Sequence, residues 1–170
     1  HAVAGDPGLL ETVRDTLFSR CSDDQLLMAH FARPVLQFAT PLNLFGSLKK
    51  PLHGIDIKKG ALFPLVHGVR AMALQCRIRE TSTLARLDKL VAAGAMEPGF
   101  AEDLGEAMEL FSELRLSRQL AKLQGEDETV EDNHIVVQQL SSLERDVLRD
   151  ALHLVSEFKQ RLSRRFHLEY

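Results

Sequence analysis

Apolar residues recur at spacings of three and four along most of the chain, which is the pattern of amphipathic helices. The clearest run follows Ser141 and Ser142, either of which could begin a helix. Its apolar positions over about 25 residues are Leu143, Val147, Ala151, Val155, Phe158, Leu162 and Phe166. The pattern therefore predicts a long final helix.

Two further helices are predicted near the N-terminus. Asp6 followed by Pro7 is typical of an N-cap and a first helical residue, and the apolar spacing continues to about Cys21. A second helix is expected to start at a cap provided by Ser22 or Asp23. Pro34 falls inside its apolar pattern, so we expect a kink or break there.

A long irregular connection is predicted from about Thr40 to Lys58, because prolines and glycines interrupt it repeatedly. Connections of this length in a compact domain usually have a function or a packing partner. A third helix is expected from about Lys59 to Ile78. Pro64 lies close enough to its start to be tolerated.

The rest of the pattern gives two more helices. One follows the turn Glu80–Thr83 and ends near Gly94, and the other follows Pro98 and extends to Gly125. Residues 126–132 form an acidic segment that we expect to be a solvated loop. No stretch alternates with period two for long enough to predict a strand. The fold predicted is all-α, a bundle of five to seven helices with antiparallel neighbours.

Composition narrows the class of protein. The chain has 170 residues, 45% of them hydrophobic and 26% charged, which fits one globular domain spanning residues 1–170. A net charge of −3 gives no electrostatic case for DNA or an anionic membrane. Cys21 and Cys76 are too few for a disulfide framework, and no apolar run could span a membrane. We expect a cytoplasmic setting. Since the chain begins without methionine, we expect it to be a piece of a longer protein.

The start of the third helix carries the densest group of candidate binding residues. In a regular helix, Lys59, Phe63, His67 and Arg70 would share one stripe, next to an apolar stripe facing the core. With Lys58, this basic edge could bind an anion, a nucleotide or an acidic partner helix. The alternative is that Arg70 pairs with a carboxylate of a neighbouring helix while the lysines stay solvated.

Asp56 first suggests catalysis, because Gly46-Ser47 precedes it at the spacing used by polymerase-β-type nucleotidyltransferases. Those enzymes need two carboxylates one residue apart to hold divalent metals. Here the second position is Lys58, which repels a cation, so we reject the catalytic interpretation. Asp56 is instead expected to bind the exposed amides at the start of the third helix.

Other candidate sites have less support. Basic strips occur on the fifth helix and on the last helix; their members are Arg115, Arg118, Gln119 and Lys122, and Arg145, Arg149 and His153. The seven histidines include no pair four residues apart, so no metal site is predicted.

Arg161 and His167 have the spacing used by helical ribonucleases of the HEPN type, which is a remote alternative.

Several separated fragments together resemble one family. They are Ile55–Gly60, Gly68–Arg70, Ala73-Leu74, Glu80–Thr83, Arg86-Leu87, Leu114–Leu116 with Gln119, Asp132-Asn133 and Leu140–Arg145. Over residues 26–166 the chain resembles the C-terminal nucleotidyltransferase substrate-binding domain of bacterial signal-transduction proteins. In that family the domain follows a cyclic-nucleotide-binding-like module, a CBS-domain pair and a nucleotidyltransferase domain.

The resemblance implies an all-helical domain similar to the substrate-binding domains of kanamycin nucleotidyltransferase and glutamine synthetase adenylyltransferase. It implies a non-catalytic accessory role, with the upstream catalytic domain, a nucleotide or a protein acceptor as partners. Nucleotide and Mg²⁺ would belong to the parent protein, and this chain alone is expected to hold no cofactor. The ligand or partner candidates are Lys58, Lys59, His67, Arg70, Arg115 and Arg145. The motif positions expected to be structural are Asp56, Gly60, Thr81, Thr83, Arg86, Gln119 and Asn133.

A second hypothesis is a structural interaction or homodimerisation module without a ligand. It predicts that Asp56 and Arg70 are buried in intramolecular pairs, which are costly to break from one side only.

Overall fold

The computed structural model describes residues 4–125 and 132–168, and these residues are predominantly helical. The α-helices are α1 (Pro7–Cys21), α2 (Gln25–Ala32), α3 (Phe63–Gln75), α4 (Thr83–Ala92), α5 (Pro98–Leu123) and α6 (Ser142–Phe166). The prediction of an all-α bundle is confirmed, and so is the long final helix of 25 residues. The acidic segment, apart from Asp132, lies outside the described residues.

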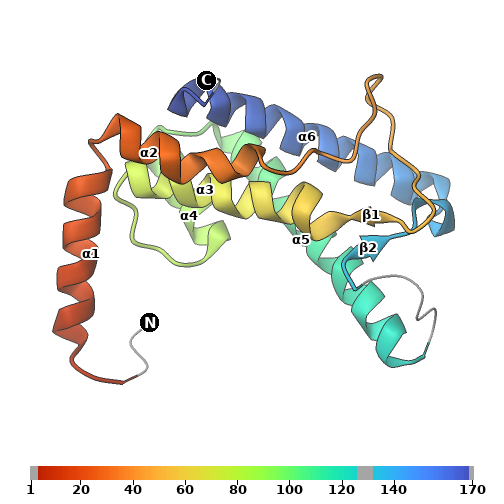
Figure 1. Ribbon diagram of the computed structural model, residues 1–170, viewed down its shortest axis with the longest axis horizontal. Coiled ribbons are helices and arrows are strands. Elements are labelled where there is room, and N and C mark those ends of the chain that lie inside the picture. Colours follow the sequence, from red (N-terminus) through yellow and green to blue (C-terminus); the bar gives the residue numbers. More distant parts are fainter. Residues whose placement is uncertain (1–3, 126–131, 169–170) are drawn as a thin grey trace.

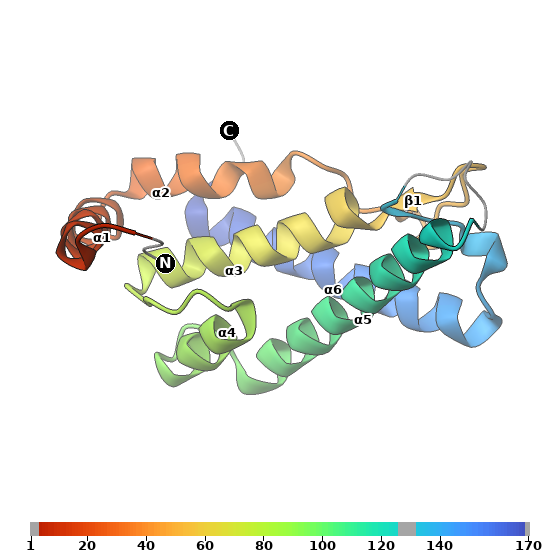
Figure 2. The same cartoon turned by 90° about the horizontal axis from the view of Figure 1, so that it is seen from below.

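Helix α3 is the centre of the bundle (Figures 1 and 2). It packs against α2, α4 and α6, and buried residues occur on nearly all its sides. In Figure 2, α2 and α5 run in one direction while α3 and α6 run in the other. The antiparallel expectation therefore holds for α2 with α3 and for α5 with α6, whereas α3 and α6 are parallel.

The α3–α6 contact depends on a glycine. A Cβ atom at Gly68 would lie 2.4 Å from Leu162 Cδ1 and 2.7 Å from Phe158 Cε1. Both neighbouring side chains are 1% exposed, so an added methyl group would have to displace two buried side chains. The absence of a side chain at position 68 thus sets how closely the two helices approach.

Helix α1 stands apart from the other helices at one end of the molecule (Figure 1). Asp6 caps it by accepting a hydrogen bond from Gly8 N (2.8 Å), and Pro7 is its first residue, as predicted. Arg79 holds it to the bundle through ion pairs with Glu11 (2.8 Å) and Asp15.

The cap of α2 differs from the prediction. Asp24, and not Ser22 or Asp23, is the N-cap, and its Oδ1 accepts from Leu27 N (2.9 Å). The physical reason is that the other two side chains are already engaged. Ser22 Oγ donates to the Phe18 carbonyl (2.6 Å), and Asp23 pairs with Arg77 (2.6 Å).

The predicted break at Pro34 and the predicted start of the last helix are both confirmed. Residues Arg33–Leu36 form a short 3₁₀ turn, η1, in place of continued α-helix. Ser141 caps α6 in a capping box: Ser141 Oγ accepts from Glu144 N (3.2 Å), and Glu144 accepts from Ser141 N (2.7 Å).

The third helix differs from a regular helix at both ends. It begins with a π-helical turn, η2 (Lys58–Leu62), in which the amide of Phe63 donates to the Lys58 carbonyl. It ends at Gln75 and not at Ile78, because Arg77 adopts a left-handed backbone conformation with φ of 56°. The wider turn changes the register of Lys59 relative to the residues that follow, so the predicted basic stripe is not continuous.

The expectation of no strand is wrong in one small region. Strands β1 (Ile55–Asp56) and β2 (His134–Ile135) pair antiparallel at the end of the bundle away from α1 (Figure 1). Two residues per strand are too few to show period-two alternation. A short 3₁₀ turn, η3 (Val137–Gln139), follows β2.

The long connection before α3 has packing partners, as expected. Gly60 lies against Pro41, where an added Cβ would be 2.8 Å from Pro41 Cδ. Gly54 lies in the same way against the backbone of Ile135, with φ of 81°. Within the connection an isolated bridge joins Leu42 to Leu48, and His153 donates to the Gly46 carbonyl (2.8 Å).

Replacing Gly68 with alanine should lower the free energy of unfolding by about 1–3 kcal/mol, because the methyl group overlaps two buried side chains. Urea denaturation of the variant measures this cost. Gly99→Ala is the matched control, because a Cβ at Gly99 would have nothing within 4 Å. Equal stability of the two variants would show that the α3–α6 contact tolerates a wider separation.

Candidate functional site

Charged and polar motif residues meet around the β1–β2 pair. The carbonyl of Asn133 accepts from Ile57 N (2.9 Å), and its side-chain Oδ1 accepts from Arg115 Nε (2.7 Å). Asn133 therefore joins the start of the third helix to α5. Arg115, predicted as a ligand candidate, is here a bridge between two elements, and its ligand-binding role stays a prediction.

Asp56 binds the start of the third helix as predicted. Its Oδ1 accepts from Lys59 N (2.9 Å), and its Oδ2 lies 3.4 Å from Lys59 Nζ. The Asp56 carboxylate thus satisfies an exposed amide and compensates the Lys59 charge. Lys58 is exposed and has no ion pair among the described residues.

His67 holds α2 against α3. Its Nε2 donates to the Phe31 carbonyl (2.7 Å), and its ring stacks on Phe63 at 5.5 Å between centroids. Arg145 makes a comparable local contact, donating to the Leu140 carbonyl (2.6 Å) just before α6. The ligand-binding roles of His67 and Arg145 stay predictions, whereas their observed contacts are those of packing residues.

The two basic strips also make internal contacts. On α5, Lys122 pairs with Asp132. On α6, Arg149 is within 3.2 Å of both Asp146 and Asp150, and His153 binds the Gly46 carbonyl. Lys122 and Arg149 are therefore compensated by nearby carboxylates, whereas Arg115 and Arg145 bond neutral oxygen atoms.

Arg70 differs from the basic residues above. It is exposed on α3, so the prediction that it is buried in an ion pair is wrong. Its charge acts on Arg86 of α4, which is half-buried. Burial, and after it the Arg70 charge, lowers the pKa of the Arg86 guanidinium, while the carboxylate of Glu80 opposes that shift.

The Arg70–Arg86 pair, these two side chains on adjacent helices, therefore places two positive charges together with Glu80 as the carboxylate that acts on Arg86. Within residues 4–125 and 132–168, neither guanidinium has a carboxylate oxygen within 4.0 Å, and the buried Nε of Arg86 has no hydrogen-bond partner. Arginine at such a position is suited to bind carboxylate or phosphate in a bidentate manner. Arg86 was predicted as structural, and only the fold shows that it lies beside Arg70.

The remaining motif positions surround these two regions. Thr83 is the first residue of α4, Thr81 is exposed just before it, and Gln119 is half-buried on α5. Gly60 serves the close packing on Pro41 described above. Among the described residues, no three His, Cys, Asp or Glu side chains gather into a metal-binding arrangement.

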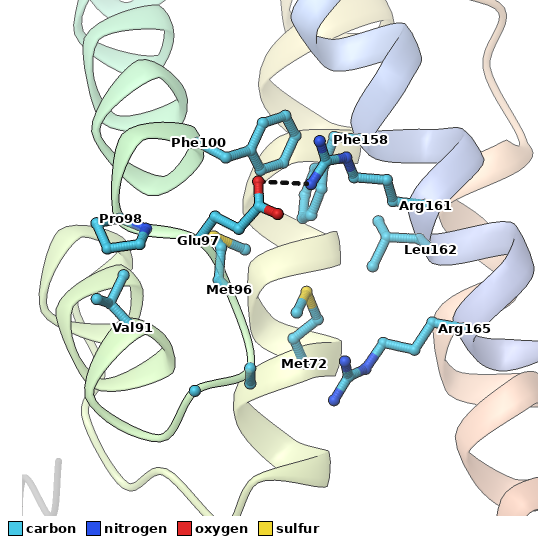
Figure 3. A pocket seen from close by; sticks show the side chains of 12 residues that line it. Met72, Val91, Met96, Glu97, Pro98, Phe100, Phe158, Arg161, Leu162 and Arg165 are labelled. Atoms are coloured by element: carbon cyan, nitrogen blue, oxygen red, sulfur yellow. Dashed lines mark ion pairs between the residues drawn. The ribbon is translucent and has the colours of Figure 1, made fainter.

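A pocket of about 520 Å³ lies elsewhere on the molecule, between α3, the α4–α5 connection and α6 (Figure 3). Arg161 and Arg165 reach over it from successive turns of α6. Their spacing of four residues, shared by Phe158 and Leu162, is the signal in the sequence that places both arginines on one face of α6. Arg161 pairs with Glu157 (2.7 Å), whereas His167 lies exposed beyond the helix end with φ of 52°. The ribonuclease alternative remains an untested prediction.

Comparison with known families identifies the chain. A family described as "Putative nucleotidyltransferase substrate binding domain" matches residues 25–166. The chain belongs to this family. The match covers all elements from α2 to α6 and includes Arg70 and Arg86, whereas α1 lies outside it. No curated protein and no solved structure gives a significant match. None of the helices described here is both long and apolar enough to cross a membrane.

Asp56→Ala should lower the free energy of unfolding by about 0.5–2 kcal/mol, because the amide of Lys59 loses its acceptor. Lys58→Ala is the control, since this neighbouring side chain is exposed. Chemical denaturation of both variants measures the difference. If Asp56→Ala is as stable as Lys58→Ala, the carboxylate does not hold the start of the helix.

Proposed function

We propose that this member of the family is the non-catalytic substrate-recognition domain of a nucleotidyltransferase-type signalling protein. In this proposal the Arg70–Arg86 pair contacts an anionic group of the nucleotide or the acceptor. The observation that supports it is that two arginines on neighbouring helices within the matched region interact electrostatically, and that neither forms an ion pair with a carboxylate among the described residues.

An anion at this position would relieve an unfavourable feature. It would neutralise the repulsion between the guanidiniums and accept hydrogen bonds from the exposed Arg70. Hydrogen bonds to charged groups contribute about 1.5–3 kcal/mol each. The pair is therefore better suited to an anionic ligand than Lys59 or Arg149, whose carboxylate partners are already in place.

The catalytic step is assigned to another domain of the same protein. In this proposal the parent combines a cyclic-nucleotide-binding-like module, a CBS-domain pair and a nucleotidyltransferase domain, and it works in the cytoplasm. Nucleotide and Mg²⁺ would be held mainly by the catalytic domain, and this chain would complete the cleft over the acceptor. The two free cysteines, Cys21 and Cys76, fit a reducing compartment.

Titration of the 170-residue chain with ATP, followed by ¹H–¹⁵N NMR, tests whether the pair binds a nucleotide directly. We expect saturable shifts at Arg70, Arg86 and the turn before α4, and we expect Arg70→Gln to abolish them. Because Arg70 is exposed, Arg70→Gln should change the free energy of unfolding by no more than about 0.5 kcal/mol.

Arg149→Gln is the matched control for this titration. It removes one exposed arginine whose charge is compensated by Asp146 and Asp150. If both variants lose the ATP-induced shifts equally, the binding depends on the net charge of the chain and not on a specific contact with Arg70. The absence of any shift near Arg70 at millimolar ATP would rule out direct nucleotide binding by this chain.

A homodimerisation role is the second candidate, and α1 is the observation that favours it. Leu9, Val13 and Leu17 follow one another at spacings of four, and their exposed fractions are 68%, 66% and 46%. The stripe lies on a helix that stands apart from the bundle (Figure 1). Two copies of such a stripe can pack against each other across a two-fold axis.

If α1 joins two copies, Val13→Glu should convert a dimer to a monomer without loss of helicity. Light scattering after size-exclusion chromatography measures the mass, and circular dichroism measures the helicity. Thr12→Glu adds the same charge beside the stripe and should leave the mass unchanged. A wild-type chain that stays monomeric at high concentration would contradict this candidate.

A further inference from the structure

We propose that the pocket between α3, the α4–α5 connection and α6 binds a small aromatic molecule that carries a single anionic group. The proposal is independent of the Arg70–Arg86 pair, because none of the residues around the pocket belongs to that pair.

The pocket has a preformed apolar floor. Its floor residues are Met72, Met96, Phe100, Phe158 and Leu162, all less than 10% exposed. Figure 3 shows these side chains converging from α3, α5 and α6 on one recess. A volume of about 520 Å³ is within the usual range of small-molecule sites. Because the floor belongs to the core of the bundle, a ligand would find it already ordered.

The shape and chemistry of the walls favour a flat ring. The Arg161 guanidinium lies 3.9 Å from the Phe100 ring centroid, so two planar groups form one side of the pocket. Met72 and Met96 supply flexible thioether side chains, which make favourable contacts with aromatic rings. An aromatic ring would therefore have planar and sulfur-containing surfaces to pack against.

Arg165 is the group that selects an anion. Its Nε donates to Gln75 Oε1 (2.6 Å), and no carboxylate pairs with it in the part of the chain that the structure describes. In Figure 3 its guanidinium lies below Met72, at the end of the pocket away from Phe100. Its charge is therefore uncompensated at the edge of an apolar recess, where a ligand anion would be partly shielded from water.

The charge balance limits the ligand to one negative charge. Arg161 is already compensated by Glu157 (2.7 Å) and, less closely, by Glu97 (3.8 Å), whose side chain is 78% exposed. A polyphosphate would meet the repulsion of both carboxylates, whereas a monoanion needs only Arg165. This distinguishes the ligand class from the nucleotide considered for the Arg70–Arg86 pair.

The four methionines allow the site of binding to be located directly. We would label their methyl groups with ¹³C and titrate the chain with 1-naphthoate, which joins an aromatic ring system to one carboxylate. Met72 and Met96 line the pocket, whereas Met28 and Met108 lie outside it and act as internal controls. We expect saturable shifts confined to Met72 and Met96. Shifts at all four methyl groups, or at none up to the solubility limit, would overturn the proposal.

The contribution of the anion is measured with a neutral probe and two arginine variants. We expect 1-naphthamide, which lacks the charge, to bind about tenfold more weakly than 1-naphthoate. A loss of this size corresponds to one charge-assisted hydrogen bond. Arg165→Gln should reduce 1-naphthoate affinity by the same factor and leave 1-naphthamide unchanged. Arg164→Gln, a change at the neighbouring exposed arginine outside the pocket, should leave both affinities unchanged. Equal losses in the two variants would contradict an anion contact at Arg165.

Discussion

The close approach of α3 and α6 at Gly68 is the constraint on which the rest of the structure depends. With no side chain at this position, Phe158 and Leu162 of α6 pack directly against the α3 backbone. A central helix surrounded by neighbours then becomes feasible, because α2, α4 and α6 can all contact α3. The same contact fixes the orientation of α6. Phe158 and Leu162 face inward, and Arg161 and Arg165 consequently lie at the edge of the pocket.

Charge compensation separates the structural from the candidate binding residues. Asp56 with Lys59, and Asn133 with Arg115, use their polar groups to connect elements that are distant in sequence. The Lys59 charge is thereby compensated by a carboxylate, and the Arg115 guanidinium is held in place by a neutral amide. The Arg70–Arg86 pair and Arg165 form no ion pair with a carboxylate in the described residues. Arg86 is half-buried, and leaving a partly buried cation without an ion pair has an energetic cost, while Arg70 and Arg165 are exposed and accessible to a ligand.

The two proposed sites use different sides of the central helix. Arg70 lies on the exposed side of α3 beside α4, while Met72 faces the pocket beneath α6. Binding at one site could affect the other only if α3 shifted together with the helices packed around it. The close packing of α6 on Gly68 opposes such a shift. The structure therefore favours two independent binding events on one rigid bundle.

The sequence by itself determined the helices, several of their ends and the family. Spacings of three and four reflect which face of a helix is buried, and Asp6, Pro7 and Ser141 act on amides a few residues away, so both signals are local. Only the tertiary structure decided the pairing of Ile55–Asp56 with His134–Ile135, the choice of Asp24 as a cap, and the neighbours of Arg70 and Arg165. Each of these depends on groups far apart in the chain, such as Arg77 drawing Asp23 away from the α2 cap. The free energy of a charged side chain is set by which helix packs beside it, and a local pattern carries no information on that.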